Sequence, residues 1–374
     1  MKCVLLLSSV HPATDPRIRY KTAPALATRF EVICALPGNE IRVDEQSAGI
    51  KMIWLPRYQS LLLRILICHP ILLWKCFRLR PDYVHIFVPE LIPIAFLFKW
   101  SGSQIIYEVQ ENLFMKFEIK TRNNHAIFRL LFTYMDSCAR KHFHFIFTDD
   151  AYLNEYQNLK YPSTIIRNFV SLTFVDQYVI QNTKWPTNQR SFFYCGVVSM
   201  ERCFDVLVAA LALIVHEYPD VMVHLFGPVR FHEKDAEQLP DYHKVKKHLV
   251  FYGYTDLREA LPYAKHCIAG IALLKPVADY QESYTTKIFE YMALNLPVIT
   301  SSFPLYEDVV QKSECGFCIA PDDALLLSEK MKWIIANPDG TRTMGRNGRI
   351  AAEELYSWEK EQPKLLKFYN QINK

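Results

Sequence analysis

The sequence predicts an α/β protein built from two doubly wound domains, each with a parallel sheet between layers of helices. Short apolar runs alternate with helical segments along the chain, which is typical of buried parallel strands and their crossover helices. This series is interrupted at residues 171–191, where the apolar period is lost and Asn, Gln, Thr and Pro accumulate. The length, 374 residues, is sufficient for two cores of ordinary size.

Composition places the chain among globular proteins and argues against several other classes. Apolar residues make up 50% and charged residues 22%, which is too apolar for a disordered chain. The ten cysteines lie mostly in strand-like stretches, as buried thiols do in a reducing compartment. The opening run MKCVLLLSS indicates a first strand and not a signal peptide, and no apolar run approaches the ~20 residues of a membrane span. The net charge of +4 comes without a dense basic cluster, so no nucleic-acid partner is expected.

The first domain is predicted over residues 1–170, with strands at KCVLLLSS, FEVICAL, PDYVHIFVP, SQIIYEVQ, FHFIFTDD and STIIRNF. After the first strand, Asp15 is a suitable N-cap with Pro16 at the first helical position. Pro24 should kink or shorten that helix. The first loop, SSVHPATDPR, contains no glycine, so the GxGxxG of dinucleotide-binding domains is absent and NAD-dependent chemistry is not expected.

After the linker at 171–191, the second domain is predicted over 192–355. Its strands are SFFYCGVV, VMVHLFGP, LVFYGYT, CIAGIALL and PVITS, separated by helices that include FDVLVAALALIVHEYP and TKIFEYMAL. Asn295 is expected in the left-handed conformation where the last of these helices turns back into a strand. Cys315 and Cys318 form a CxxC without a second pair, which favours a strand over a zinc site. Residues 356–374 should form a C-terminal helix that can pack back on the first domain.

The stretch YQESYTTKIFEYMALNLPVITS carries the strongest signal for a ligand. A helix that begins near Lys287 leaves its first N–H groups free, and these groups together with the helix dipole favour a phosphate. Glu290 is not part of a capping box, because a cap at Thr286 would put Phe289 at the third position. A carboxylate beside a diphosphate commonly accepts hydrogen bonds from sugar hydroxyls. The alternative is a solvated loop with an ordinary i,i+3 pair of Lys287 and Glu290.

The spacing of Glu282 and Glu290, E-x7-E, followed by YMALNLPVITS, resembles the retaining glycosyltransferases of family 4. Similar segments extend over most of the chain: SSVHPATDPRIRYKTAPALATRFEVICALPG, YCGVVSMERCFDVLVAALALI, SECGFCIAPDD and YSWEKEQPKLLKFY. The resemblance implies the GT-B fold, in which two Rossmann-like domains face a central cleft. It also implies transfer of a sugar from a nucleotide diphosphate-sugar with retention of configuration, without a metal or other cofactor.

Carried onto this sequence, the resemblance implies a role for individual residues. Glu290 would hold the ribose hydroxyls of the nucleotide, and Glu282 would hold the hydroxyls of the donor sugar. Arg202 would contact the diphosphate, as a family residue of the same charge does. The donor-binding set is completed by the following residues: Gly196, Ser283, Tyr284, Thr285, Thr286 and Lys287.

Three positions depart from the family pattern. Val197 stands where an Arg often contacts phosphate, and Cys203 stands where a glycine usually follows the basic residue. Gln110 replaces a His of the family, and its amide can form hydrogen bonds but cannot change charge. Glu111 and His11 are the other catalytic candidates of the first domain, beside Glu282 of the second. For His11 the alternative is a loop histidine bonded to the backbone.

Residues 57–81 contain five basic residues and no acidic one, with apolar residues between them. Basic amphipathic helices of this kind lie on anionic membranes. The alternative is a core-facing helix pair whose basic side chains reach outward to water. The family resemblance favours the membrane, because many relatives use lipid-linked acceptors.

The sequence therefore predicts a metal-independent retaining glycosyltransferase with a glycan or lipid-linked acceptor, acting in surface polysaccharide or glycolipid biosynthesis. It is expected in the cytoplasm, with residues 57–81 as a means of peripheral attachment to the inner face of the cytoplasmic membrane. One alternative is a sugar-nucleotide 2-epimerase, which needs a donor site but no acceptor surface. The non-enzymatic alternative, suggested by Gln110 and Val197, is a sugar-nucleotide-binding subunit that has lost catalysis.

Overall fold

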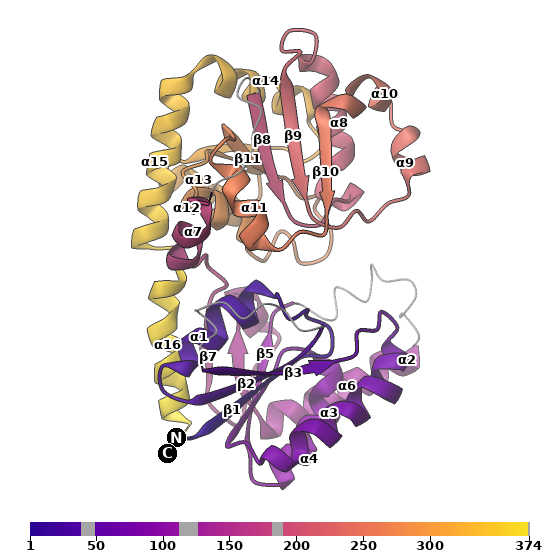
Figure 1. The fold of residues 1–374 in the computed structure, drawn as a ribbon, viewed down its shortest axis with the longest axis vertical. Helices are drawn as coiled ribbons and strands as arrows, with labels where there is room; N and C mark the ends of the chain where they lie inside the picture. The colour runs from indigo at the N-terminus through magenta and orange to yellow at the C-terminus, as the bar shows by residue number, and fades with distance from the viewer. Residues whose placement is uncertain (39–48, 112–125, 182–189, 373–374) are drawn as a thin grey trace. The chain divides into compact units, whose positions relative to one another are not determined.

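The computed structural model describes residues 1–38, 49–111, 126–181 and 190–372. The chain forms two compact units: unit 1 comprises Met1–Asn168 and Trp358–Lys374, and unit 2 comprises Phe169–Ser357 (Figure 1). Each unit has a parallel sheet with helices on its faces, so the predicted fold class is confirmed. Among the described residues, no helix is long and apolar enough to cross a membrane.

The sheet of unit 1 has the order β3-β2-β1-β4-β5-β6-β7, and every pairing is parallel. Its strands are β1 Cys3–Leu7, β2 Glu31–Pro37, β3 Ile50–Leu55, β4 Tyr83–Ile86, β5 Gln104–Val109, β6 His144–Phe147 and β7 Ser163–Ile165. The strand order reverses between β1 and β4, which is where parallel α/β sheets bind ligands. The edge strand β3 was missed by the sequence analysis, because only its two end residues are buried and its apolar run is broken by Lys51.

Helices cover both faces of this sheet (Figure 1). They are π-helix Ile18–Thr22 and α1 Ala23–Ala27, α2 Leu61–Leu63, π-helix Arg64–Cys68 and α3 His69–Cys76, α4 Ile92–Trp100, α6 Ala126–His142 and α16 Trp358–Gln371, with short 3-10 turns at Phe77–Leu79, Pro89–Leu91 and Asp150–Asn154. One core lies between the sheet and α3, α4 and α6, and the other lies between the sheet and α1 and α16.

The first helix begins where the sequence predicted. The Asp15 carboxylate accepts a hydrogen bond from the Ile18 amide at 3.0 Å, so its capping role is confirmed. Pro24 neither ends this helix nor leaves it regular, because the turn before it, Ile18–Thr22, widens into a π-helix. The wider turn adapts the backbone to a residue that has no N–H to donate.

The C-terminal helix α16 belongs to unit 1, although 189 residues of unit 2 precede it in the chain. Its Leu365 and Phe368 are buried in the same core as Val4 of β1. Tyr369 is also buried, and its hydroxyl lies 2.8 Å from Nδ1 of His85 in β4. The first unit is therefore completed only when the chain returns to it.

The sheet of unit 2 has the order β10-β9-β8-β11-β12-β13, again entirely parallel. Its strands are β8 Arg190–Cys195, β9 Val221–Phe226, β10 Leu249–Gly253, β11 Ala269–Ala272, β12 Val298–Ser301 and β13 Gly316–Ile319. Its helices are α7 Leu172–Val179, α8 Phe204–Ile214, α9 Glu233–Glu237, α10 Tyr242–Val245, α11 Leu257–Ala264, α12 Thr286–Ala293, α13 Pro304–Lys312, α14 Ala324–Ala336 and α15 Pro338–Glu354, with 3-10 turns at Met200–Arg202 and Lys246–His248.

The stretch predicted as a linker differs from the structure. Its first part forms helix α7, which packs in unit 2 and buries Phe174, Val175 and Tyr178 on one face. Ser171 caps this helix by accepting the Phe174 amide at 3.4 Å. An eight-residue helix is too short to be stable alone, so packing decides its formation and the polar composition misled the sequence analysis. Residues 182–189 of the predicted linker lie outside the described residues.

Two local predictions in unit 2 are confirmed. Asn295 has φ +56°, in the left-handed region, directly after α12 and its C-cap. Cys318 lies within β13, and the buried Cys315 immediately precedes that strand. Burial raises the pKa of both thiols to about 12, so both are protonated structural residues.

Candidate active site

In unit 2, two cations converge on the glycine that follows β8. Gly196 has φ +142°, and a Cβ added to it would lie 2.9 Å from Cε of Lys287 and 3.3 Å from Nη1 of Arg202. Only glycine therefore leaves room for both side chains at this point. Since β8 and β11 are the strands between which the sheet order reverses, the two cations occupy the position where such sheets bind ligands.

Lys287 is buried, with 3% of its surface exposed, although it lies on the first turn of a helix. Among the described residues, the Thr285 hydroxyl is its one hydrogen-bond partner, at a long 3.5 Å. Burial and the nearby Arg202 lower the pKa of Lys287 to about 7, and Glu290 opposes this shift. The alternative of a solvated Lys287–Glu290 surface pair therefore does not describe this lysine.

Arg202 ends the 3-10 turn Met200–Arg202, and Cys203 follows in the left-handed conformation with φ +58°. This backbone conformation favours glycine, which gives a physical reason for the glycine that usually follows the basic residue in the family. Cys203 adopts it at some energetic cost, and its thiol is buried against α8.

The N-terminus of α12 points free amides toward this region. Its N-cap is Thr285, one residue before the predicted Thr286, and the Thr285 side chain accepts no hydrogen bond from the first-turn amides of the described chain. The amides of Thr286 and Lys287 are therefore donors for an anion. Glu290, in the same helix, lies close enough to Lys287 to influence its pKa.

The turn before α12 is held by its own hydrogen bonds. The Ser283 hydroxyl and amide both donate to the Asp279 carbonyl, at 2.8 and 2.9 Å, and the Glu282 amide donates to it at 3.0 Å. Tyr306 donates its hydroxyl to the carbonyls of Tyr280 and Ser283, at 2.8 and 3.1 Å. Ser283 therefore acts in shaping the turn, and the exposed Glu282 side chain projects from it.

Tyr291 organises this region and was missed by the sequence analysis. Its buried hydroxyl accepts the Cys195 amide at 3.1 Å and donates to the Ile271 carbonyl at 3.2 Å, which ties the end of β8 to β11. A Cβ at Gly270 would lie 2.2 Å from the Tyr291 ring, so glycine is required beneath it. No local pattern reveals this role, because the three elements joined are distant in sequence.

In unit 1, the loop after β1 carries His11. Ser8 Oγ accepts the amides of Val10 and His11, at 3.2 and 3.0 Å, and lies 2.9 Å from Nδ1 of His11. The histidine is thus held by a hydroxyl and not by a backbone group, in contrast to the alternative drawn from the sequence. It is half-buried at the carboxyl end of β1.

Glu90, which follows β4, is a buried acid that the sequence analysis did not identify. Arg64 donates to both its oxygens, at 2.8 and 2.7 Å, and Ser9 of the β1 loop donates its hydroxyl to it. Burial raises the pKa of Glu90, but the nearby His69 and the hydrogen bonds from Arg64 and Ser9 outweigh this and lower it to about 2. Arg64 is therefore neutralised in the interior, which corrects the prediction that all five cations of 57–81 face a membrane.

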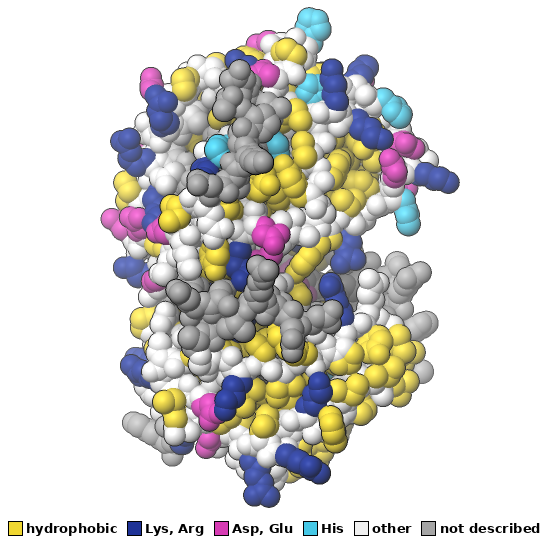
Figure 2. Space-filling view, viewed as in Figure 1, with side chains coloured by type: hydrophobic (Ala, Val, Ile, Leu, Met, Phe, Trp, Pro, Cys, Tyr) yellow, Lys and Arg dark blue, Asp and Glu magenta, His cyan; other side chains and the backbone are white. Residues whose placement is uncertain are grey.

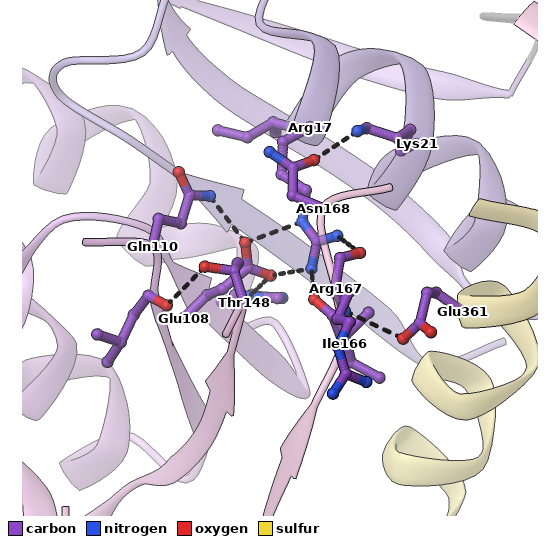
Figure 3. Close-up of polar contacts among 12 residues, drawn as sticks. Arg17, Lys21, Glu108, Gln110, Thr148, Ile166, Arg167, Asn168 and Glu361 are labelled. Carbon is purple, nitrogen blue, oxygen red and sulfur yellow. Dashed lines mark hydrogen bonds and ion pairs between the residues drawn. The ribbon is translucent and has the colours of Figure 1, made fainter. Parts of the chain in front are cut away.

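Gln110 has a fixed orientation because of the buried carboxylate of Glu108 (Figure 3). Arg17 donates to both Glu108 oxygens, at 3.1 and 3.2 Å, and the Gln110 amide nitrogen donates to Oε1 at 2.7 Å. Arg17 opposes the effect of burial and holds the pKa of Glu108 well below its usual range, so this group only accepts hydrogen bonds. The Gln110 oxygen points away from it (Figure 3) and accepts no hydrogen bond from the described residues.

Gln110→Ala is expected to lower turnover by no more than about 100-fold, because a neutral amide positions substrate but transfers no proton. Steady-state kinetics measures this. Gln110→Glu should be pH-dependent, since two neighbouring carboxylates cannot both ionise freely beside one Arg. If Glu111→Gln is inactive while both Gln110 variants retain activity, the exposed Glu111 carries the chemistry of unit 1. Full activity of Glu111→Gln and His11→Ala would contradict both of those assignments.

The fold of the chain is similar to that of GT-B glycosyltransferases of known structure. Over 100% of this chain and 99% of the other, the fold is similar to sucrose-phosphate synthase from Thermosynechococcus elongatus, with a TM-score of 0.76 and 18% identity. It is also similar to Anabaena Alr3699/HepE in complex with UDP-glucose (TM-score 0.69, 13% identity, 99% and 100% covered). A third similar structure is WaaG, a glycosyltransferase involved in lipopolysaccharide biosynthesis. Its TM-score is 0.71 and its sequence identity 14%, over 97% of this chain and 99% of that chain.

Residues 177–351 match the family model described as "Glycosyl transferases group 1", and the resemblance to glycosyltransferases seen in the sequence is confirmed. Spore coat protein SA of Bacillus subtilis (strain 168) is 22% identical over 182 residues, 47% of each chain. The putative glycosyltransferase EpsD of the same organism is 21% identical over 160 residues, 42% of this chain and 40% of that protein. The chain thus matches less than half the length of these curated relatives.

Proposed function

We propose that this protein transfers a sugar from a nucleotide diphosphate-sugar, with retention of configuration, to a glycan or lipid-linked acceptor. The observation that carries the proposal is the convergence of Lys287 and Arg202 at Gly196, beside the free amides of α12. Two cations and a helix N-terminus form a site for a diphosphate. The solved structure of Alr3699/HepE with UDP-glucose supports the class of donor.

The arrangement also suits the reaction. As the bond between sugar and phosphate breaks, negative charge grows on the departing diphosphate, and preorganised cations stabilise that charge. Lys287, Arg202 and the α12 amides would supply this stabilisation without a metal. Glu290 would accept hydrogen bonds from the ribose hydroxyls, and Glu282 from the hydroxyls of the donor sugar. With Val197 in place of a further Arg, Arg202 would be the cation that the loop after β8 supplies to the phosphates.

A thermal-shift panel of UDP-, GDP- and ADP-sugars tests this proposal and identifies the base. A ligand present at 100 times its dissociation constant should stabilise the protein by about 2.7 kcal/mol. Stabilisation by none of the three classes would contradict a donor site. Product analysis without an acceptor then distinguishes a glycosyltransferase from a 2-epimerase, because the epimerase would convert the donor alone. A subunit without catalysis would bind the donor but form no product.

For the acceptor, we propose that unit 1 binds the cytoplasmic face of an anionic membrane through residues 57–81. This segment is apolar on two sides. Cys68, Leu72 and Cys76 pack in the core, whereas Leu66 and Trp74 are 69% and 73% exposed. Figure 2 shows hydrophobic side chains over α2 and α3 with Lys and Arg side chains nearby. The alternative, a core-facing helix pair whose basic side chains reach outward to water, does not account for these exposed apolar side chains.

The cations of this surface are Arg57, Lys75, Arg78 and Arg80, all exposed, while Arg64 pairs with Glu90. Replacing Arg57, Arg78 and Arg80 with Gln should weaken binding to vesicles that contain anionic lipid by up to about 100-fold, at roughly 1 kcal/mol per charge. Co-sedimentation measures this, and raising the salt concentration should have the same effect on the wild type. The melting temperature should hardly change.

Lys234, Lys244 and Lys247, replaced with Gln together, provide the matched control, since they are exposed cations of unit 2. This control should sediment with vesicles as the wild type does. A wild type that remains in the supernatant at low salt would rule out the membrane surface, while the donor site of unit 2 would be unaffected.

A further inference from the structure

Several ionisable groups lie around Lys287. Tyr194 and Cys195 approach from β8, with the Lys287 nitrogen 5.4 Å from the centre of the Tyr194 ring. The other groups that influence it are Arg202, Cys203 and Glu290. Glu290 is the one carboxylate in this set of described residues, and Arg202 is a second cation.

This environment contains few hydrogen-bond acceptors for a lysine ammonium group. A protonated lysine has three N–H donors, and the described residues offer one long hydrogen bond, to Thr285. The side chain is 3% exposed, so water cannot replace the missing acceptors. A charge buried in this way costs free energy unless it is paired, and Arg202 adds repulsion. Consistently, the pKa of Lys287 is lowered to about 7, so the free amine is well populated near neutral pH.

We propose that a nucleoside diphosphate enters this site together with a proton, which Lys287 takes from solvent to become an ammonium. The inference rests on the proposed donor site and adds the number of protons that are taken up when the ligand binds there. The step forms one N–H bond on the Lys287 amine and leaves the ligand unchanged. The phosphate oxygens supply the acceptors and the negative charge that the free protein does not provide to this nitrogen.

The pKa of Lys287 with and without ligand determines how the affinity for the nucleoside diphosphate changes with pH. Without ligand the pKa of Lys287 lies near 7, and an anion at hydrogen-bond distance raises it. Between these two values binding takes up a proton, so affinity falls with rising pH, by at most tenfold per unit. Below pH 7 the lysine is protonated in both states and the uptake vanishes.

The thiols and the phenol around Lys287 do not titrate in this window. Burial raises the pKa of Cys203 to about 12 and raises those of Cys195 and Tyr194 as well. The terminal phosphate of UDP or GDP, with a pKa of about 6, is fully ionised above pH 8. A proton that is taken up at pH 8.5 by the wild type but not by the Lys287 variants therefore identifies Lys287.

The experiment is calorimetry of UDP and GDP binding at pH 8.5, in buffers that differ in their ionisation enthalpy. The apparent binding enthalpy should vary with the buffer, with a slope that corresponds to uptake of up to one proton per ligand. From pH 7.5 to 9.5 the affinity of the wild type should fall. Lys287→Arg, which is permanently charged, should bind without uptake and without this pH dependence. Lys287→Met should bind more weakly and also without uptake.

Lys332→Met is the control, because this half-buried lysine of α14 is paired with Glu217 and should leave the uptake unchanged. Binding of UDP or GDP by the wild type without proton uptake would overturn the inference but leave the donor site standing. Uptake that persists in Lys287→Arg would assign the proton to another group and overturn it as well. If neither UDP nor GDP binds, while no ADP-sugar stabilises the protein, the proposed function fails and the inference fails with it.

Discussion

Arg17→Met should destabilise the protein by about 3–5 kcal/mol, which is the usual cost of removing one partner of a buried ion pair. Glu108 is fully buried, and Arg17 donates to both its oxygens, so the variant would leave a buried carboxylate without its counter-ion. The same guanidinium donates to the carbonyls of Ile166 and Arg167, at 2.9 and 3.0 Å, and both bonds would be lost (Figure 3). Urea unfolding at pH 7 measures the change.

Two comparisons make this result specific. Arg190→Met breaks a half-exposed pair with Asp220 and should cost less than about 1 kcal/mol. The double variant Arg17→Met with Glu108→Leu removes both charges and should regain much of the lost stability. Because the pKa of Glu108 is lowered by folding, its contribution is present above the ordinary range of a glutamate and declines as the pH falls below that range. A single variant as stable as the wild type at pH 7 would contradict the ion pair.

Glu290→Ala should weaken the binding of UDP or GDP by about 10- to 150-fold, or about 1.5–3 kcal/mol, the contribution of a hydrogen bond to a charged group. The proposed role of Glu290 is to accept the ribose hydroxyls, which both the nucleotide and the nucleotide-sugar carry. The loss should therefore be equal for UDP and UDP-glucose, or for GDP and GDP-mannose, measured by calorimetry. The melting temperature should stay close to that of the wild type.

Glu282→Ala is the matched control for this prediction, since Glu282 is proposed to contact the sugar and not the nucleotide. Its variant should lose affinity for the nucleotide-sugar but bind the free nucleotide as the wild type does. Unchanged nucleotide binding by a folded Glu290→Ala protein would remove the role assigned to Glu290. If Glu290→Ala loses affinity only for the nucleotide-sugar, Glu290 contacts the hydroxyls of the sugar and not those of the ribose.

The sequence by itself determined the features that depend on near neighbours. Apolar runs predicted most strands, because burial on both faces of a parallel sheet leaves a continuous apolar signal. The cap at Asp15 and the left-handed Asn295 were predicted from single residues, since a cap or a turn depends on its adjacent backbone. The helical segment predicted at TKIFEYMAL placed Glu290 on α12, because helical periodicity is a local property of the sequence.

Only the tertiary structure decided which distant groups meet. Glu108 pairs with Arg17, 91 residues away, and orients Gln110. Arg64 pairs with Glu90, so its charge does not contribute to the basic surface. Lys287 looked like one half of a surface pair, but the folding of β8 and the Arg202 turn around α12 buries it. These contacts follow from strand order and crossover packing, which bring residues together irrespective of their separation in sequence. A local pattern can therefore name the candidate residues, but their burial and partners, and thus their charge, depend on the assembled sheets.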